Sequence, residues 1–164
     1  MNDDRDSGAS PWRPIVRGRA AVGVPAGLDV VDVARVSVSS EQACFPIDSV
    51  FDRQRGPGGS RWIASSGGEQ TVLVAFDEPQ DIRSIVVESE HRGGMTQLTL
   101  DLAVGDGEAF EELGSRAFAF RPYGPSFRSE TWRLPPGVVK QVRIRVTPAT
   151  PAERACLTSV VFLA

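Results

Sequence analysis

The sequence predicts an all-β protein, an antiparallel β-sandwich of the jelly-roll type. Three observations predict it. Short runs rich in β-branched residues recur from Leu28 onward, turn residues separate them, and no long segment after residue 28 has the 3.6-residue period of an amphipathic helix. The length of 164 residues is that of one domain, which buries a sufficient core without disulfides or metal ions.

Eight segments are expected to be strands: residues 30–38, 70–77, 82–89, 96–104, 116–121, 129–134, 139–147 and 156–163. Two of them alternate cleanly, because Leu98, Leu100, Leu102 and Val104 share one face of their strand and Val142, Ile144 and Val146 share one face of theirs. Turn sequences at 77–81, 105–107 and 135–137 separate strands. The exception to the β pattern is one short helical turn expected at 47–53. The segment 121–128 is too rich in Gly and Pro to be expected as a strand.

Residues 1–27 are polar and rich in Gly, Pro and Arg, so we interpret them as an arm that precedes the domain at 28–164. Two interpretations of the arm stay open. It is either a flexible tail or a segment that docks on its own domain or on a partner, with Trp12 as the anchor.

Charge and targeting signals narrow the class of protein. A net charge of -3 argues against a nucleic-acid binder driven by charge alone. The acidic start and the absence of a long apolar run predict a cytoplasmic protein without a membrane segment. Cys44 and Cys156 do not have zinc-ligand spacing and are expected to be buried, reduced thiols.

No catalytic motif is present in the sequence. We find no nucleophile elbow, phosphate loop or HExxH, and the adjacent Glu111 and Glu112 would point to opposite faces of a strand. His91 with Glu88 and Glu90 is not a specific metal-ligand set. We therefore predict a protein that is not an enzyme.

The candidate ligand site follows from strand parity. Connections of an antiparallel sandwich alternate between its ends, so 53–69, 90–95, 121–128 and 148–154 are expected at one end and the acidic segments 77–81, 105–108 and 135–138 at the other. The first end is rich in arginine, whose planar fork of donors fits carboxylates, phosphates or paired sugar hydroxyls. The candidate ligand-binding residues there are His91, Arg92, Arg121, Tyr123, Phe127, Arg128, Arg53 and Arg61. A solvated loop end without a ligand stays an open alternative.

Several motifs occur together in a characteristic order. Pro46-Ile47-Asp48 is followed by Ser60-Arg61-Trp62, then by 71–77 with Pro79 and the strand 82–87, and later by 102–113, 131–134, 142–146 and 157–162. In this order they resemble the discoidin family (coagulation factor five/eight type C) and its relatives, the family 32 carbohydrate-binding modules. The resemblance covers residues 30–164 and implies a galactose-binding-domain-like jelly roll that binds rather than catalyses. It also implies that Trp62 and Trp132 belong to the core.

The resemblance further implies a structural calcium ion, held by an Asp of the first loop and a Glu of the last strand. Asp48 and Asp52 are the calcium candidates in the first loop, but 158–162 contains no Glu. We therefore predict no cofactor, and calcium at Asp48 and Asp52 stays the open alternative.

Two functions stay open. The first is a non-catalytic module for carbohydrate, including acidic or phosphorylated sugars, bound at the arginine- and aromatic-lined loop end. The second is an intracellular scaffold domain with a protein partner, or less favourably a nucleic acid, similar to the amino-terminal domain of the X-ray repair cross-complementing scaffold protein.

Overall fold

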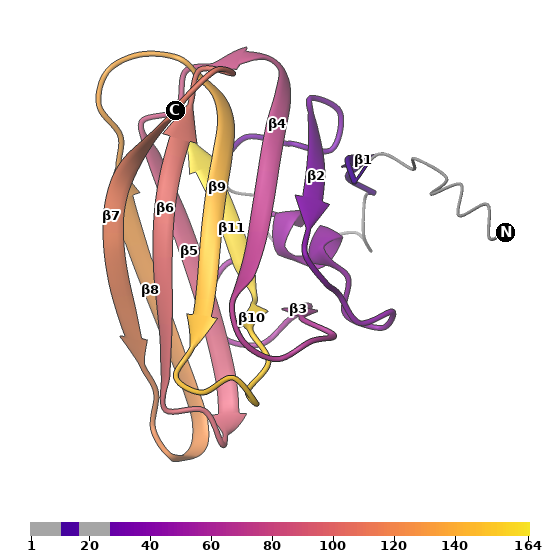
Figure 1. Ribbon diagram of the computed structural model, residues 1–164, viewed down its shortest axis with the longest axis vertical. Coiled ribbons are helices and arrows are strands. Elements are labelled where there is room, and N and C mark those ends of the chain that lie inside the picture. The colour runs from indigo at the N-terminus through magenta and orange to yellow at the C-terminus, as the bar shows by residue number, and fades with distance from the viewer. Residues whose placement is uncertain (1–10, 17–26) are drawn as a thin grey trace, which may run out of the picture.

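In the computed structural model, which describes residues 11–16 and 27–164, two antiparallel sheets face each other across an apolar core (Figure 1). The larger sheet has the strand order β1 (Arg13–Pro14), β2 (Ala34–Val38), β4 (Gln70–Gln80), β9 (Val139–Pro148), β6 (Gln97–Gly105) and β7 (Phe110–Ala119). The smaller sheet has the order β11 (Ser159–Leu163), β5 (Ser84–Gly93) and β8 (Tyr123–Arg133). A short pair, β10 (Cys156–Leu157) with β3 (Trp62–Ile63), and the 3-10 turn η1 (Ile47–Phe51) complete the described elements. The predicted sandwich is confirmed.

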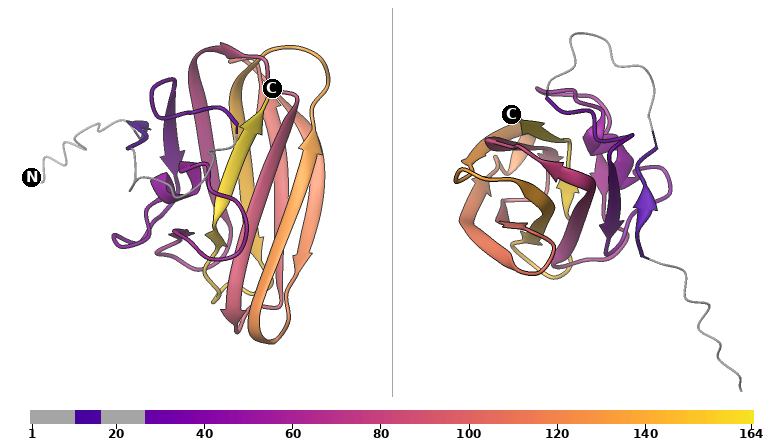
Figure 2. Two further views of the ribbon diagram at one scale, coloured as in Figure 1. Left: turned by 180° about the vertical axis from the view of Figure 1, so that it is seen from behind. Right: turned by 90° about the horizontal axis from the view of Figure 1, so that it is seen from above.

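The core consists of the inward residues of both sheets. Leu100 lies opposite Val146 and Leu102 opposite Ile144 in the β6–β9 register, and all four are fully buried. The alternation of 98–104 and 142–146 therefore predicts the buried face correctly. Trp62 and Trp132 are also buried, as the resemblance implied. The view from above shows the strands of the two sheets arranged around the interior (Figure 2).

The β7–β8 hairpin is longer than the sequence predicts. Only residues 120–122 join the two strands, and the expectation that 121–128 is not a strand is wrong. The reason is that β8 is an edge strand paired only with β5, where the missing N–H of Pro125 and a φ of 75° at Gly124 are tolerated. The predicted strand 30–38, by contrast, is shorter in the structure. It begins only at Ala34, because the Val30 carbonyl accepts turn hydrogen bonds from the N–H groups of Val33 and Ala34.

The arm contributes a strand to the larger sheet. Arg13 and Pro14 of β1 pair with Val36 and Arg35 of β2, so this part of the predicted arm docks on its own domain. The remaining arm residues, 1–10 and 17–26, lie outside the described residues.

The free edges of β7 and β8 lie beside each other on one side of the sandwich. Arg116 of β7 reaches across: its Nη1 donates to Glu130 Oε2 at 3.0 Å and to the Thr131 carbonyl at 3.3 Å. Its guanidinium carbon lies 5.1 Å from the centroid of the Trp132 ring. Arg116 thus links the two sheets where no backbone ladder does.

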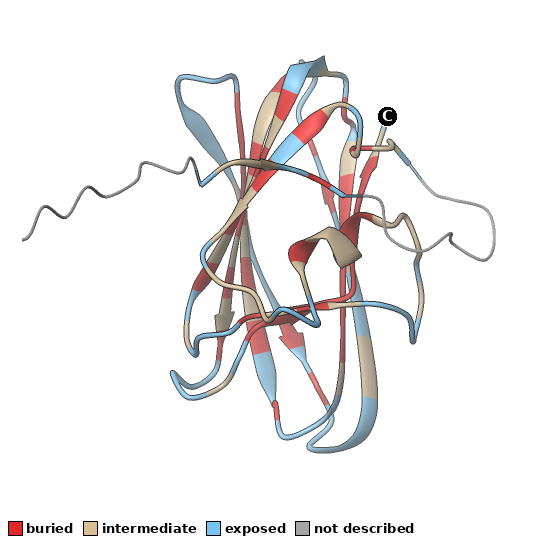
Figure 3. Cartoon of the chain, turned by 90° about the vertical axis from the view of Figure 1, so that its right-hand side faces the viewer, coloured by how far each residue is buried: buried red, intermediate tan, exposed pale blue. Residues whose placement is uncertain are grey.

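Exposed residues lie at the two ends of the sandwich and along β7 and β8, while buried residues run along β4, β5, β6, β9 and β11 (Figure 3). No helix among the described residues is long and apolar enough to cross a membrane.

Candidate ligand-binding site

The connections between strands fall into two groups at opposite ends of the molecule (Figure 1). Residues 94–96, 120–122 and 149–155 lie at the end farther from the C-terminus, which we call the lower end. Residues 81–83, 106–109 and 134–138 lie at the upper end. The alternation expected from strand parity is therefore present for these six connections.

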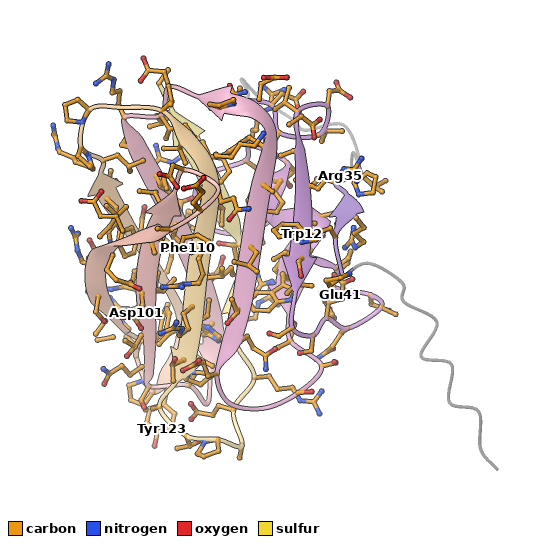
Figure 4. The ribbon with its side chains drawn as sticks, turned by 45° about the horizontal axis from the view of Figure 1, so that its top comes forward. Trp12, Arg35, Glu41, Asp101, Phe110 and Tyr123 are labelled. Carbon is orange, nitrogen blue, oxygen red and sulfur yellow. The ribbon has the colours of Figure 1, made fainter. Side chains whose placement is uncertain are left out.

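An aromatic ring and two arginines stand free at the lower end. The Tyr123 side chain is the most exposed large apolar group of the described residues, at 87%, and Figure 4 shows it at the tip of this end. Tyr123 pairs with Gly93 in the β5–β8 register, which places the exposed Arg92 close to it. Arg121, also exposed, precedes Tyr123 by two residues, and its backbone N–H donates to Ser126 Oγ at 3.2 Å. These three side chains form the part of the predicted site that lies at the tip.

Phe127 and Arg128 lie higher on β8 than Tyr123. Phe127 faces Glu90 in the register and is half-buried, while Arg128 lies opposite Ser89 and is exposed. They extend the candidate site from the tip along the outer strand.

His91 belongs to the wall of the sandwich rather than to its open tip. Its ring packs edge-on against Phe120 with centroids 4.6 Å apart. Burial, and then the neighbouring Arg61, lower the pKa of His91 from 6.5 to about 4, although Glu90 opposes the shift. The imidazole is therefore neutral at pH 7 and presents hydrogen-bonding groups without charge.

A serine lies against this histidine, but the pair is not arranged for catalysis. Ser89 Oγ is 3.2 Å from His91 Nε2 and donates its only proton to the Cys156 carbonyl at 2.6 Å. The histidine must therefore donate from Nε2 to the serine oxygen, the reverse of a general base. Ser89 is also fully buried, out of reach of a substrate.

Two of the predicted ligand residues make contacts within the protein and do not lie free at the tip. Arg61 Nη1 donates to the Glu90 carbonyl at 3.1 Å and its side chain is only 16% exposed. Arg53 pairs with Asp29 at 3.4 Å, on a segment whose Leu28 N–H donates to Phe162 of β11. The placement of 53–60 at the lower end is wrong, because this segment lies along β5.

Two buried carboxylates of β5 hold that segment and were not found from the sequence. Glu88 accepts from the Gly56 N–H at 2.9 Å, and Glu90 accepts from the Gly58 N–H at 2.5 Å. Arg55 adds an ion pair to Glu88 at 3.5 Å. The signal in the sequence was the combination of alternating acids in a strand with an insert rich in Gly and Arg, which supplies complementary donors.

The calcium candidates are occupied by protein donors. Asp48 pairs with Arg13 at 2.5 Å, and Asp52 accepts from Ser60 Oγ at 2.6 Å. Where the first loop meets the last strands, a cavity of about 130 Å³ is lined by 54–60 and Thr158, without a carboxylate. Among the described residues, no group of three or more His, Cys, Asp or Glu side chains is arranged to hold a metal ion. Calcium needs six to eight oxygen ligands, so these residues do not fit the ion.

The two cysteines differ from each other. Cys156 is buried, and burial raises the pKa of its thiol to about 11. Cys44 is exposed, so the expectation that both are buried is wrong for Cys44. It lies in the loop between β2 and η1.

Comparison with solved structures identifies the fold. The family 32 module of NanJ from Clostridium perfringens, in complex with galactose, is similar with a TM-score of 0.58 and 14% identity over 79% of this chain and 92% of that one. The chain has the family 32 carbohydrate-binding module fold. This is the discoidin-like, galactose-binding-like β-sandwich that the motif order indicates.

Other modules with this fold give similar values. A pectin-binding module matches with a TM-score of 0.55 and 15% identity, covering 79% of this chain and 88% of that one. The family 32 module of AlyQ, in complex with 4,5-unsaturated mannuronic acid, matches with a TM-score of 0.54 and 15% identity, covering 78% and 92%. No family model matches the sequence, and no curated protein matches it.

Proposed function

We propose that this chain is a non-catalytic module that binds carbohydrate at the lower end of the sandwich. The observation that carries the proposal is the exposed Tyr123 ring flanked by the unburied Arg92 and Arg121, on a fold shared with carbohydrate-binding modules. Rigid sandwiches commonly carry their binding residues on such loop ends.

The chemistry of the three side chains suits a sugar. A flat aromatic ring packs against the apolar face of a pyranose and loses little conformational entropy, since Tyr has few rotatable bonds. A guanidinium donates two parallel hydrogen bonds to a carboxylate or to neighbouring hydroxyls. Tyr123 would hold the ring of the sugar while Arg92 and Arg121 bind its substituents.

We propose an acidic sugar as the ligand. Two arginines with no carboxylate among the three exposed groups favour an anionic substituent. The pectin-binding neighbour and the neighbour in complex with a mannuronic acid derivative support this choice. The alternative of a protein or nucleic-acid partner has no comparable support.

The test is a binding panel of neutral, uronic and phosphorylated oligosaccharides with short DNA as a comparison, followed by calorimetry or NMR shift mapping. A uronic oligosaccharide should bind, and Tyr123→Ala or Arg121→Gln should weaken binding at least tenfold. The matched control is Arg133→Gln, an exposed arginine at the upper end of β8 opposite Ser84.

Two outcomes would contradict the proposal. Binding that survives both lower-end variants would place the site elsewhere on the sandwich. Binding of DNA with no response to any sugar would favour the scaffold alternative.

A further inference from the structure

We infer that arginine guanidinia and backbone N–H groups hold the first loop of this protein in the role that a calcium ion plays in the family it resembles, so that its fold is independent of calcium. This inference concerns the segment 39–61, between β2 and β3. It does not depend on the identity of the proposed ligand.

The first anchor is Glu88, near the middle of β5. Its side chain is 3% exposed and lies on the outer face of the smaller sheet. One carboxylate oxygen accepts from the Gly56 N–H at 2.9 Å, and the other lies 3.5 Å from Arg55 Nε. A buried carboxylate is stable only when its charge and lone pairs are satisfied, and both are satisfied here from within the segment.

The second anchor is Glu90, two residues further on the same face. It accepts from the Gly58 N–H at 2.5 Å and has Arg61 Nη2 at 4.0 Å. The two N–H groups point toward β5 because Gly56 and Gly58 have φ values of 95° and 83°, which L-residues with a side chain rarely adopt. The glycines therefore give the segment its two spaced donors, matched to alternate residues of a strand.

The third anchor is Arg13 of the arm. Its Nη2 lies 3.1 Å from both oxygens of Glu41, and its Nη1 lies 2.5 Å from Asp48. The Ile47 N–H donates to Glu41 at 2.8 Å, and the Val16 N–H donates to Asp48 at 3.2 Å. Arg13 is thus a cation between the carboxylate of Glu41, which precedes η1, and that of Asp48 in its first turn, and it comes from outside the loop that it fixes.

The three anchors use four carboxylates, those of Glu41, Asp48, Glu88 and Glu90. Asp52, the other carboxylate of the loop, accepts from Ser60 Oγ at 2.6 Å. A calcium ion would have to displace Arg13 from Asp48 and Glu41, or Arg55 and two N–H groups from Glu88 and Glu90. Thr158 Oγ1, one of the buried oxygens that lack a hydrogen-bond partner among the described residues, lines the small cavity together with Arg55, whose positive charge repels a cation. These contacts favour the arginine guanidinium groups over a calcium ion at the carboxylates.

The first experiment follows thermal unfolding of the full chain after chelator treatment, with and without millimolar calcium, and measures calcium uptake by titration calorimetry. We expect the unfolding midpoint to change by less than about 1 °C and no stoichiometric uptake. A midpoint raised by several degrees, or uptake of one ion with micromolar affinity, would overturn the inference.

The second experiment measures amide hydrogen exchange of Gly56 and Gly58 by NMR in Glu88→Gln and Glu90→Gln. Exchange of Gly56 should accelerate at least tenfold in the first variant and exchange of Gly58 in the second, because a neutral amide oxygen is a weaker acceptor than a carboxylate. Glu78→Gln, at an exposed position of β4, is the control and should leave both amides unchanged. If either variant fails to fold, Arg55→Gln tests the first anchor and should accelerate Gly56 exchange alone. Equal exchange in all these variants would contradict the anchors.

Discussion

The two outer faces of the sandwich have opposite environments although both are built from alternating strands. On the larger sheet, Arg143 and Arg145 of β9 point outward, with side chains 20% and 39% exposed. On the smaller sheet, the outward Glu88 and Glu90 of β5 are buried beneath 54–60. The difference teaches that strand alternation decides which face a side chain takes, whereas a distant segment decides whether that face meets water.

The sharpest test of this comparison removes one acid from each face. Glu88→Ala should lower the free energy of unfolding by about 3–4 kcal/mol, because it leaves the Gly56 N–H without its acceptor and Arg55 without its partner. Glu112→Ala, which breaks the ion pair with Arg143 where the Glu112 side chain is 61% exposed, should cost less than about 1 kcal/mol. Urea unfolding of both variants measures the difference. Equal losses would mean that the two faces do not differ energetically.

A pH titration tests how much His91 of β5 contributes to the stability of the fold. The pKa of His91 falls from 6.5 to about 4 in the folded protein, so between these values the unfolded chain binds more protons. The contribution of His91 to stability is therefore complete above pH 6.5 and is lost as the pH falls toward 4. The loss should be about 2 kcal/mol for a ring that is partly exposed.

The readout is the difference in unfolding free energy between pH 7 and pH 4.5, compared with His91→Gln. That variant lacks the titrating ring but keeps the carboxylates that also respond to acid. The same pH dependence in both proteins would show that carboxylates, and not His91, account for the loss.

Arg116→Ala tests the contact between β7 and β8, which joins the two sheets. It removes the guanidinium from the Trp132 ring and two hydrogen bonds to β8, at partly exposed positions, so the expected loss is about 1 kcal/mol. Arg116→Lys keeps the charge but not the planar fork and should recover about half of it. Thermal unfolding measures both variants, and a neutral Arg116→Ala would mean that packing alone joins the sheets.

The smallest effect is expected at the lower end. Arg92→Ala and Arg121→Ala should change the free energy of unfolding by less than about 0.5 kcal/mol, because both side chains are exposed. Loss of carbohydrate binding without loss of stability would show that the two arginines contribute to binding and not to folding. Unfolding of either variant would contradict its placement on an open end.

The sequence predicted the parts of the fold that depend on local pattern. β6 and β9 alternate strictly, since each has one face in the core and one toward solvent, and the order of motifs around Trp62 and Trp132 indicated the correct fold. The assignment of the connections to two opposite ends of the sandwich followed from strand parity alone. Tyr123, Arg92 and Arg121 were placed together at one end because alternation along an antiparallel chain needs no knowledge of side-chain contacts.

The remainder depended on contacts between distant residues. The sequence Val-Val-Glu-Ser-Glu in β5 reads as a half-exposed strand, and only the segment 54–60, thirty-two residues earlier in the chain, buries the acids. β1 and β3 are two residues long and too short to give a pattern. Arg53 and Arg61 were assigned to the ligand site because loop membership does not reveal whether an arginine faces solvent or a buried carbonyl.

The open side of the sandwich has a consequence for self-association. β7 and β8 each keep one edge without a ladder partner, and such edges recruit strands from other molecules. Here the two edges lie beside each other, and Arg116 occupies the Thr131 carbonyl that an incoming strand would need. Glu111, an exposed charged side chain on β7, further disfavours pairing with a second copy of this edge. The architecture therefore resists edge-to-edge aggregation without closing into a barrel.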